Sequence, residues 1–70
     1  MTVIVNEKKI TLKEREDAPV TVTDLLKEMN VPEKGTAVAV NNRMVRRDDW
    51  TGHKLADGDK VLLIKAAYGG

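Results

Sequence analysis

The chain ends in Gly69-Gly70, and the carboxylate of that last glycine is the group best suited to chemistry in this sequence. A terminal carboxylate is ionised at neutral pH and is available as a nucleophile towards ATP. Glycine has no side chain to hinder that attack, and its backbone adopts angles closed to other residues, so Gly69-Gly70 can thread a narrow slot in a partner protein. The alternative is a frayed end without function, which is the usual state of a terminus.

Residues 66–70 are predicted to form a flexible tail beyond a folded domain of residues 1–65. When extended, this tail reaches at most roughly 16 to 18 Å, which is enough to carry the carboxylate into the active site of another protein. The predicted site therefore has Gly70 as the modified residue. The residues expected to enter a partner's active site are Ala66, Ala67, Tyr68, Gly69 and Gly70.

The rest of the chain offers little catalytic chemistry. The sequence has no cysteine, and His53 is the only histidine, so a metal site and a thiolate nucleophile are not expected. No Ser-His-Asp arrangement and no glycine-rich phosphate loop can be recognised. A chain of 70 residues also leaves little room for a deep pocket. We therefore expect a protein that is not itself an enzyme and binds no cofactor.

Composition excludes further classes of function. The 12 basic and 11 acidic residues give a formal charge of +1, and Trp50 and Tyr68 are the only aromatic residues, so a nucleic-acid binder is not expected. The sequence opens without a signal-peptide pattern, and its apolar runs are too short to cross a bilayer. We expect a cytoplasmic domain that is a monomer when free.

Residue alternation predicts an amino-terminal hairpin. Val3-Ile4-Val5 and Ile10-Thr11-Leu12 flank a polar stretch, with Val3 and Val5 on one face and Ile4 on the other. A helix should follow, because Thr21 and Asp24 form a capping box. Its predicted buried face consists of Val22, Leu25, Leu26 and Met29. Asn30-Val31-Pro32 should end this helix, because Pro32 disfavours helical geometry at the preceding residue.

The second half of the chain predicts further strands. Residues 37–40 and 44–45 are separated by the turn residues Asn41-Asn42, residues 46–50 should make a single turn, and residues 60–65 carry the longest strand signal. The order ββαβ(β)β predicts an α+β, β-grasp fold, with one main helix on one face of a mixed four- to five-stranded sheet. The last strand should lie in the middle, parallel to the first.

The outer face of that sheet is a candidate docking surface. Leu62 and Ile64 alternate with Val61 and Leu63, so they should lie opposite the helix together with Ile4. The alternative is a set of scattered exposed aliphatic residues, which are normal on proteins.

Other conspicuous residues have ordinary structural explanations. Trp50 is expected to cover the core, and Asp57-Gly58-Asp59 to form a turn rather than a calcium site. Arg43, Arg46 and Arg47 are expected to lie on an exposed, solvated surface. The alternative hypothesis is that they contact an acidic groove of a partner protein.

Several segments together resemble the sulfur carrier proteins of thiamin biosynthesis, the ThiS family, and the likeness covers essentially the whole chain in the right order. Members of this family look like ubiquitin in fold, so the resemblance implies a ubiquitin-like β-grasp domain. The matching segments are Val3-Ile4-Val5-Asn6, residues 21–26, VAVNNRMVRRDDW at 38–50, LADGDKV at 55–61 and the closing Gly-Gly. Tyr68 departs from the small or polar residue of many relatives, and Asn42 from a frequent glycine. These departures bear on partner preference rather than on chemistry.

The resemblance implies that an E1-like, ThiF-like partner adenylates the Gly70 carboxylate with ATP. The carboxylate is then converted to a thiocarboxylate with sulfur from a donor system, and the sulfur passes to a ThiG-like thiazole synthase. Close alternatives are the small subunit of molybdopterin synthase and a carrier for tRNA thiolation. More distant alternatives are a ubiquitin-like modifier that forms isopeptide bonds and an interaction module whose tail does nothing.

Overall fold

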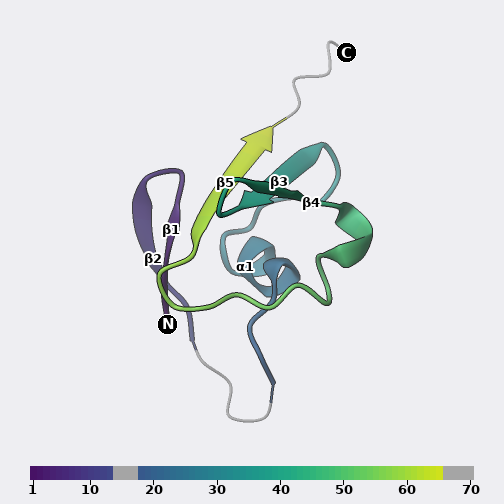
Figure 1. The fold of residues 1–70 in the computed structure, drawn as a ribbon. Helices are drawn as coiled ribbons and strands as arrows, with labels where there is room; N and C mark the ends of the chain where they lie inside the picture. The colour runs from purple at the N-terminus through teal and green to yellow at the C-terminus, as the bar shows by residue number, and fades with distance from the viewer. Residues whose placement is uncertain (14–17, 66–70) are drawn as a thin grey trace.

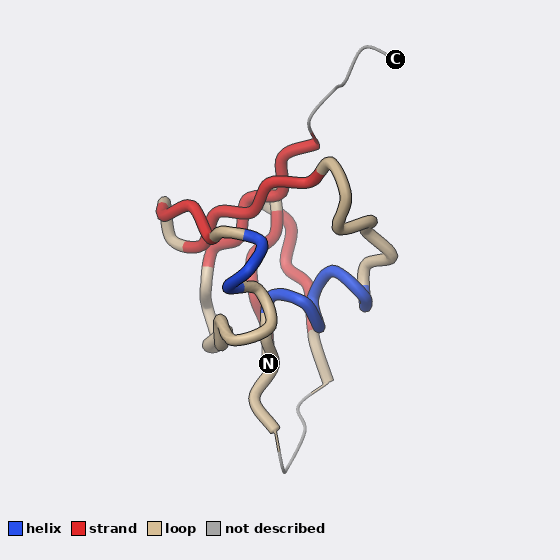
Figure 2. The backbone as a smooth tube through the Cα atoms, turned by 90° about the vertical axis from the view of Figure 1, so that its right-hand side faces the viewer, coloured by secondary structure: helices blue, strands red, loops and turns tan. Residues whose placement is uncertain are grey.

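The computed structural model describes residues 1–13 and 18–65. A five-stranded sheet with the strand order β2-β1-β5-β3-β4 runs through the molecule, and α1 packs on one side of it (Figures 1 and 2). The described elements are β1 (Thr2–Val5), β2 (Lys8–Thr11), α1 (Val22–Glu28), β3 (Thr36–Val40), β4 (Arg43–Val45), the 3-10 helix η1 (Arg47–Asp49) and β5 (Lys60–Lys65). This architecture confirms the predicted β-grasp fold.

The amino-terminal hairpin has a tighter turn than its polar stretch suggested. β1 and β2 pair antiparallel with Val3 opposite Ile10, so Lys8 and Lys9 belong to the second strand. Only Asn6 and Glu7 remain in the turn, with φ angles of 47° and 70°. Positive φ at both central residues matches the twist of the flanking strands. The predicted alternation is confirmed, since Val3 and Val5 are buried while Ile4 lies on the opposite face.

The helix begins at the predicted capping box. The backbone N–H of Asp24 donates to Thr21 Oγ1 at 3.4 Å, and the backbone N–H of Thr21 donates to a carboxylate oxygen of Asp24 at 3.0 Å. Val22, Leu25 and Leu26 are almost completely buried against the sheet. Because the helix contains only 7 residues, its stability depends on this packing more than on helix propensity.

α1 ends at Glu28 and its cap residue is Met29, so Pro32 lies too far along the chain to end it. This corrects the expectation that Pro32 terminates the helix. Asn30 adopts a left-handed φ of 56° directly after the cap residue Met29. The N–H of Asn30 then donates to Lys27 O at 3.2 Å, and the N–H of Val31 donates to Leu26 O at 2.9 Å. These hydrogen bonds satisfy the last carbonyls of the helix, so the left-handed asparagine provides the stop signal.

The remaining predictions for the second half of the chain are also confirmed. Asn41 and Asn42 have φ angles of 51° and 70° and join β3 to β4 in the same way as the first turn. Trp50, after η1, is only 2% exposed and donates its indole N–H to Val45 O at 2.9 Å. Trp50 thus covers the core between sheet and helix, as expected for a small domain without phenylalanine.

Candidate functional site

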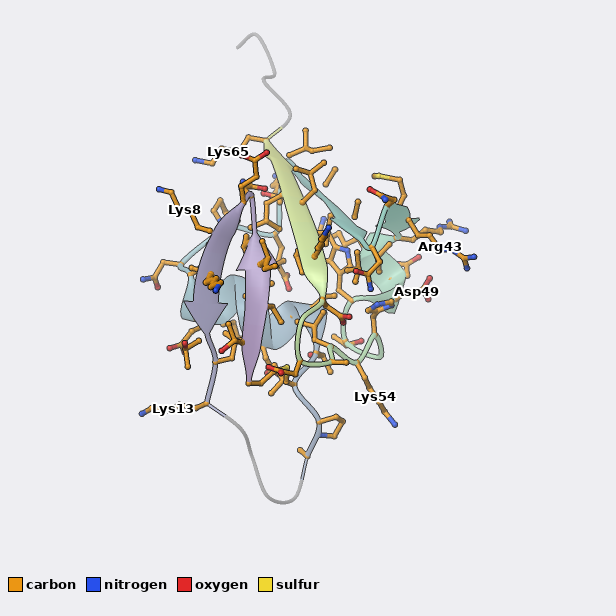
Figure 3. The ribbon with its side chains drawn as sticks, turned by 60° about the vertical axis from the view of Figure 1, so that its left-hand side comes forward. Lys8, Lys13, Arg43, Asp49, Lys54 and Lys65 are labelled. Carbon is orange, nitrogen blue, oxygen red and sulfur yellow. The ribbon has the colours of Figure 1, made fainter. Side chains whose placement is uncertain are left out.

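The base of the predicted tail is the central strand of the sheet. β5 pairs parallel with β1, where Val61 lies beside Val5, and antiparallel with β3, where Leu63 lies beside Val38. The described part of the chain ends at Lys65, at the same end of the sheet as Lys8 in Figure 3. A strand held on both sides gives whatever follows Lys65 a fixed point of departure.

The side chain of Asn6 extends the parallel pairing beyond the end of β1. The backbone N–H of Asn6 donates to Val61 O at 3.0 Å. Its side-chain amide then donates to Leu63 O at 3.3 Å, and its side-chain oxygen accepts from Leu63 N–H at 2.9 Å. The amide of Asn6 therefore takes the place of one further residue of strand backbone. It holds β5 two residues before the described chain ends.

The beginning of β5 is held by the other turn. Asn41 Oδ1 accepts from the N–H of Lys60 at 3.0 Å, and Asn41 Nδ2 donates to a carboxylate oxygen of Asp59 at 3.0 Å. The other carboxylate oxygen of Asp59 accepts from the N–H of Ala56 at 2.8 Å, and Gly58 has a φ of 88°. Asp57-Gly58-Asp59 is therefore the predicted turn, with the Asp59 carboxylate occupied in backbone contacts.

The outer face of the sheet carries the predicted docking residues. Leu62 and Ile64 are 50% and 44% exposed, and Ile4 is half-buried on the same face. Ala39 lies opposite both Leu62 and Met44, so the apolar surface continues across β3 onto β4, where Met44 is 65% exposed. We name this set the outer apolar face: Ile4, Ala39, Met44, Leu62 and Ile64.

A hollow of about 500 Å³ lies in the outer apolar face and is lined by Ile4, Asn6, Glu7, Ala39, Asn42, Lys60, Val61 and Leu62. The structure thus brings Ile4 and Leu62 together, while Ile64 lies outside the hollow. Ala39 and Met44 were missed by the sequence reasoning. The alternation of strand 37–40 could have identified Ala39 as outward-facing, whereas Met44 required the strand register.

The predicted tail lies outside the described residues. Ala66, Ala67, Tyr68, Gly69 and Gly70 are all in this segment, so their assignment as the reacting end stays a prediction.

The other conspicuous side chains remain peripheral. Arg43, Arg46 and Arg47 are exposed, and no ion pair involves them within residues 1–13 and 18–65. His53 is half-buried, and the described residues contain no cluster of three or more metal-ligating side chains. No helix within the described part is long and apolar enough to span a membrane.

Comparison with known proteins places these features in a family. The model of the ThiS family matches residues 3–70. The sulfur carrier protein ThiS of Escherichia coli (strain K12) is 38% identical over 50 residues, which are 71% of this chain and 76% of that relative.

Solved structures share the fold. The crystal structure of thiamine biosynthesis protein ThiS from Geobacter metallireducens has a TM-score of 0.79 and 28% identity, with 100% of both chains covered. The NMR structure of a thiamine biosynthesis protein from the same organism has a TM-score of 0.75 and 28% identity, covering 100% of this chain and 88% of that one. Because the family model spans nearly the whole chain, and relatives match it in both sequence and fold, this chain belongs to the ThiS family.

Proposed function

We propose that this protein is a sulfur carrier for thiazole formation in thiamin biosynthesis, with Gly70 as the residue that carries the sulfur. The observation that supports this most is the family match, which extends to Gly70 and therefore includes the Gly-Gly end. The E. coli relative is itself named a sulfur carrier protein.

The proposed chemistry begins with the Gly70 carboxylate. It attacks the α-phosphate of ATP on an E1-like, ThiF-like enzyme, forming an acyl adenylate and releasing pyrophosphate. Sulfide-level sulfur from a donor system then attacks the acyl carbon and displaces AMP, which leaves a thiocarboxylate. A ThiG-like thiazole synthase receives this sulfur. The carrier itself acts as a co-substrate in the cytoplasm, where its partner uses ATP, and binds no cofactor of its own.

The fold supports this role through the placement of β5. A carrier must present its reactive end to successive enzymes while its domain stays folded. Hydrogen bonds hold β5 to β1, to β3 and to the Asn6 side chain. The described domain therefore stays folded up to Lys65, where the predicted tail begins.

We propose further that the outer apolar face docks on the ThiF-like enzyme. Leu62 and Ile64 are large, exposed and close to the end of β5. Replacing either by glutamate should weaken binding in calorimetry, because the charge must lose its water at the interface. The circular dichroism spectrum should stay unchanged, since both side chains lie outside the core. Unchanged affinity for both variants would remove this face from the mechanism.

Mass spectrometry tests the proposed function directly. Protein produced together with its ThiF-like enzyme and a sulfur donor should contain a species heavier by the replacement of one oxygen by sulfur. Fragmentation should locate that change at Gly70. A mass change at another residue, or stable conjugates to lysines of other proteins without any thiocarboxylate, would contradict the carrier role and favour a different Gly-Gly protein.

A further inference from the structure

The hollow in the outer apolar face has an apolar floor and a charged rim. Ala39 forms part of its lining and is 7% exposed, because the larger side chains around it stand higher than its methyl group. Ile4 and Leu62 come from neighbouring strands and also line the hollow. A short residue between taller ones leaves space that a protruding side chain of another protein can fill.

Two lysines flank Ile4 on this face. Lys9 lies opposite Ile4 on β2, and Lys60 lies beside it on β5. With strands spaced about 4.8 Å apart, this row places one ammonium-bearing side chain on either side of Ile4. Both lysines are exposed, and neither forms an ion pair with any residue in the described ranges.

The acidic side chains nearby do not balance these lysines. Glu7 is the one carboxylate among the lining residues. Asp59, which precedes Lys60, uses both of its carboxylate oxygens to hold Asn41 and the N–H of Ala56. The face is therefore apolar at its centre and has unpaired positive charge beside it. A matching surface has a projecting apolar side chain with carboxylates around it.

We propose that the hollow receives an apolar side chain of the ThiF-like enzyme, and that Lys9 and Lys60 pair with carboxylates next to that side chain. This inference rests on the proposed function and adds the chemistry of the partner's surface. The apolar contact provides most of the affinity, since a desolvated anchor contributes more than exposed ion pairs do. The lysines speed association and select an acidic partner.

Filling the hollow tests the first half of the proposal. Ala39→Leu adds an apolar side chain on the outward face without adding charge. It should weaken binding to the ThiF-like enzyme at least about tenfold, because the partner's side chain loses its space. The matched control is Ala56→Leu, at an exposed loop residue outside both the hollow and the outer apolar face. Its affinity should stay within about twofold of the unmodified protein.

Charge reversal tests the second half. Lys60→Glu and Lys9→Glu should each slow association about three- to tenfold at low salt, and this difference should shrink as salt is raised. Lys27→Glu is the control, since Lys27 is an exposed residue of α1 on the other side of the sheet. Calorimetry and stopped-flow association, with melting curves of every variant, provide the measurements.

The outcomes separate this proposal from the proposed function. If unmodified protein neither binds the ThiF-like enzyme nor supports ATP–pyrophosphate exchange, the proposed function fails. If it does both while Ala39→Leu binds as tightly as Ala56→Leu, no side chain of the partner enters the hollow and the proposed function stands. Equal effects of Lys60→Glu and Lys27→Glu would show that Lys60 does not pair with carboxylates of the partner. Dimerisation of the free protein that Ala39→Leu abolishes would assign the hollow to a second copy instead.

Discussion

Asparagine occupies most of the non-glycine positions at which the described backbone has a positive φ, and at the residue scale this explains several local features. Asn6, Asn30, Asn41 and Asn42 all have positive φ. Asparagine tolerates this left-handed conformation better than most residues do, because its short amide can bond to nearby backbone. Glu7 is the exception in this set, with a φ of 70° and a longer side chain. The first hairpin therefore contains local strain.

Replacing Glu7 by glycine should relieve that strain. We expect Glu7→Gly to raise the free energy of unfolding by roughly 0.5 to 1 kcal/mol, because a left-handed conformation costs other residues about 1 to 2 kcal/mol and glycine's greater entropy in the unfolded chain offsets part of the gain. Urea denaturation measures the change. Glu7→Ala is the control, since it removes the carboxylate and keeps the strain. Equal stabilisation by both variants would show that charge, not backbone geometry, is responsible.

At the scale of elements, β5 depends on the hairpin turns on either side of it. Asn6 holds Leu63 and Asn41 holds Lys60, so each turn both reverses the chain and bonds to the central strand. On the β1 side, where the pairing of strand backbones stops at Val61, the Asn6 side chain holds Leu63, while on the other side β3 pairs with β5 as far as Lys65. The turns therefore act on β5 through their side chains as well as through their backbone.

Loss of the Asn6 amide should loosen the end of β5 in particular. Asn6→Ala should lower the free energy of unfolding by about 1 to 2 kcal/mol, because hydrogen bonds to both backbone groups of Leu63 are lost. In hydrogen exchange measured by NMR, the Leu63 amide should lose more protection than the Val61 amide.

Asn42→Ala provides the matched control for this prediction. Asn42 also has a positive φ, 70° against 47° at Asn6, so alanine is placed in the left-handed region at both positions. No hydrogen bond of its side chain to any described residue is present. If Asn42→Ala destabilised the protein as much as Asn6→Ala, strain in the turn would explain the loss and the amide bonds to Leu63 would be unimportant.

At the scale of the whole molecule, folding and the proposed chemistry occupy different parts of the chain. The core around Trp50 is built from both halves of the sequence and from one face of α1. Its members all precede Lys65 within the described residues. The opposite face of the sheet keeps large aliphatic side chains at the surface, so one sheet serves stability on one side and the proposed docking on the other.

Deleting Gly69 and Gly70 should therefore separate stability from activation. We expect the melting temperature to change little, since changes away from packed features usually alter stability by no more than about 0.5 kcal/mol. ATP–pyrophosphate exchange with the ThiF-like enzyme should be abolished, because the new terminal carboxylate lies roughly 7 Å short and belongs to the bulky Tyr68. Retained exchange would contradict the carrier role, and a large fall in melting temperature would show that this segment is structural.

The sequence alone determined those features that depend on neighbours along the chain. The alternation of Val3, Ile4 and Val5 predicted which side of the sheet each faces, since side chains of a strand point to opposite faces in turn. The Thr21–Asp24 capping box predicted where the helix begins, because both partners lie within one turn. The Gly-Gly end and the order of segments likewise indicated the family.

Only the tertiary structure decided the features that join distant parts of the chain. The bonds between Asn6 and Leu63 connect residues 57 positions apart, and no local pattern specifies such a pair. Ala39 and Met44 join Leu62 on the outer apolar face through the register of β3 with its neighbours. A shift by one residue would turn them to the other side, and the burial of Val38, Val40 and Val45 against α1 and Trp50 prevents it. The docking surface is thus set by the packing of the core on the opposite face.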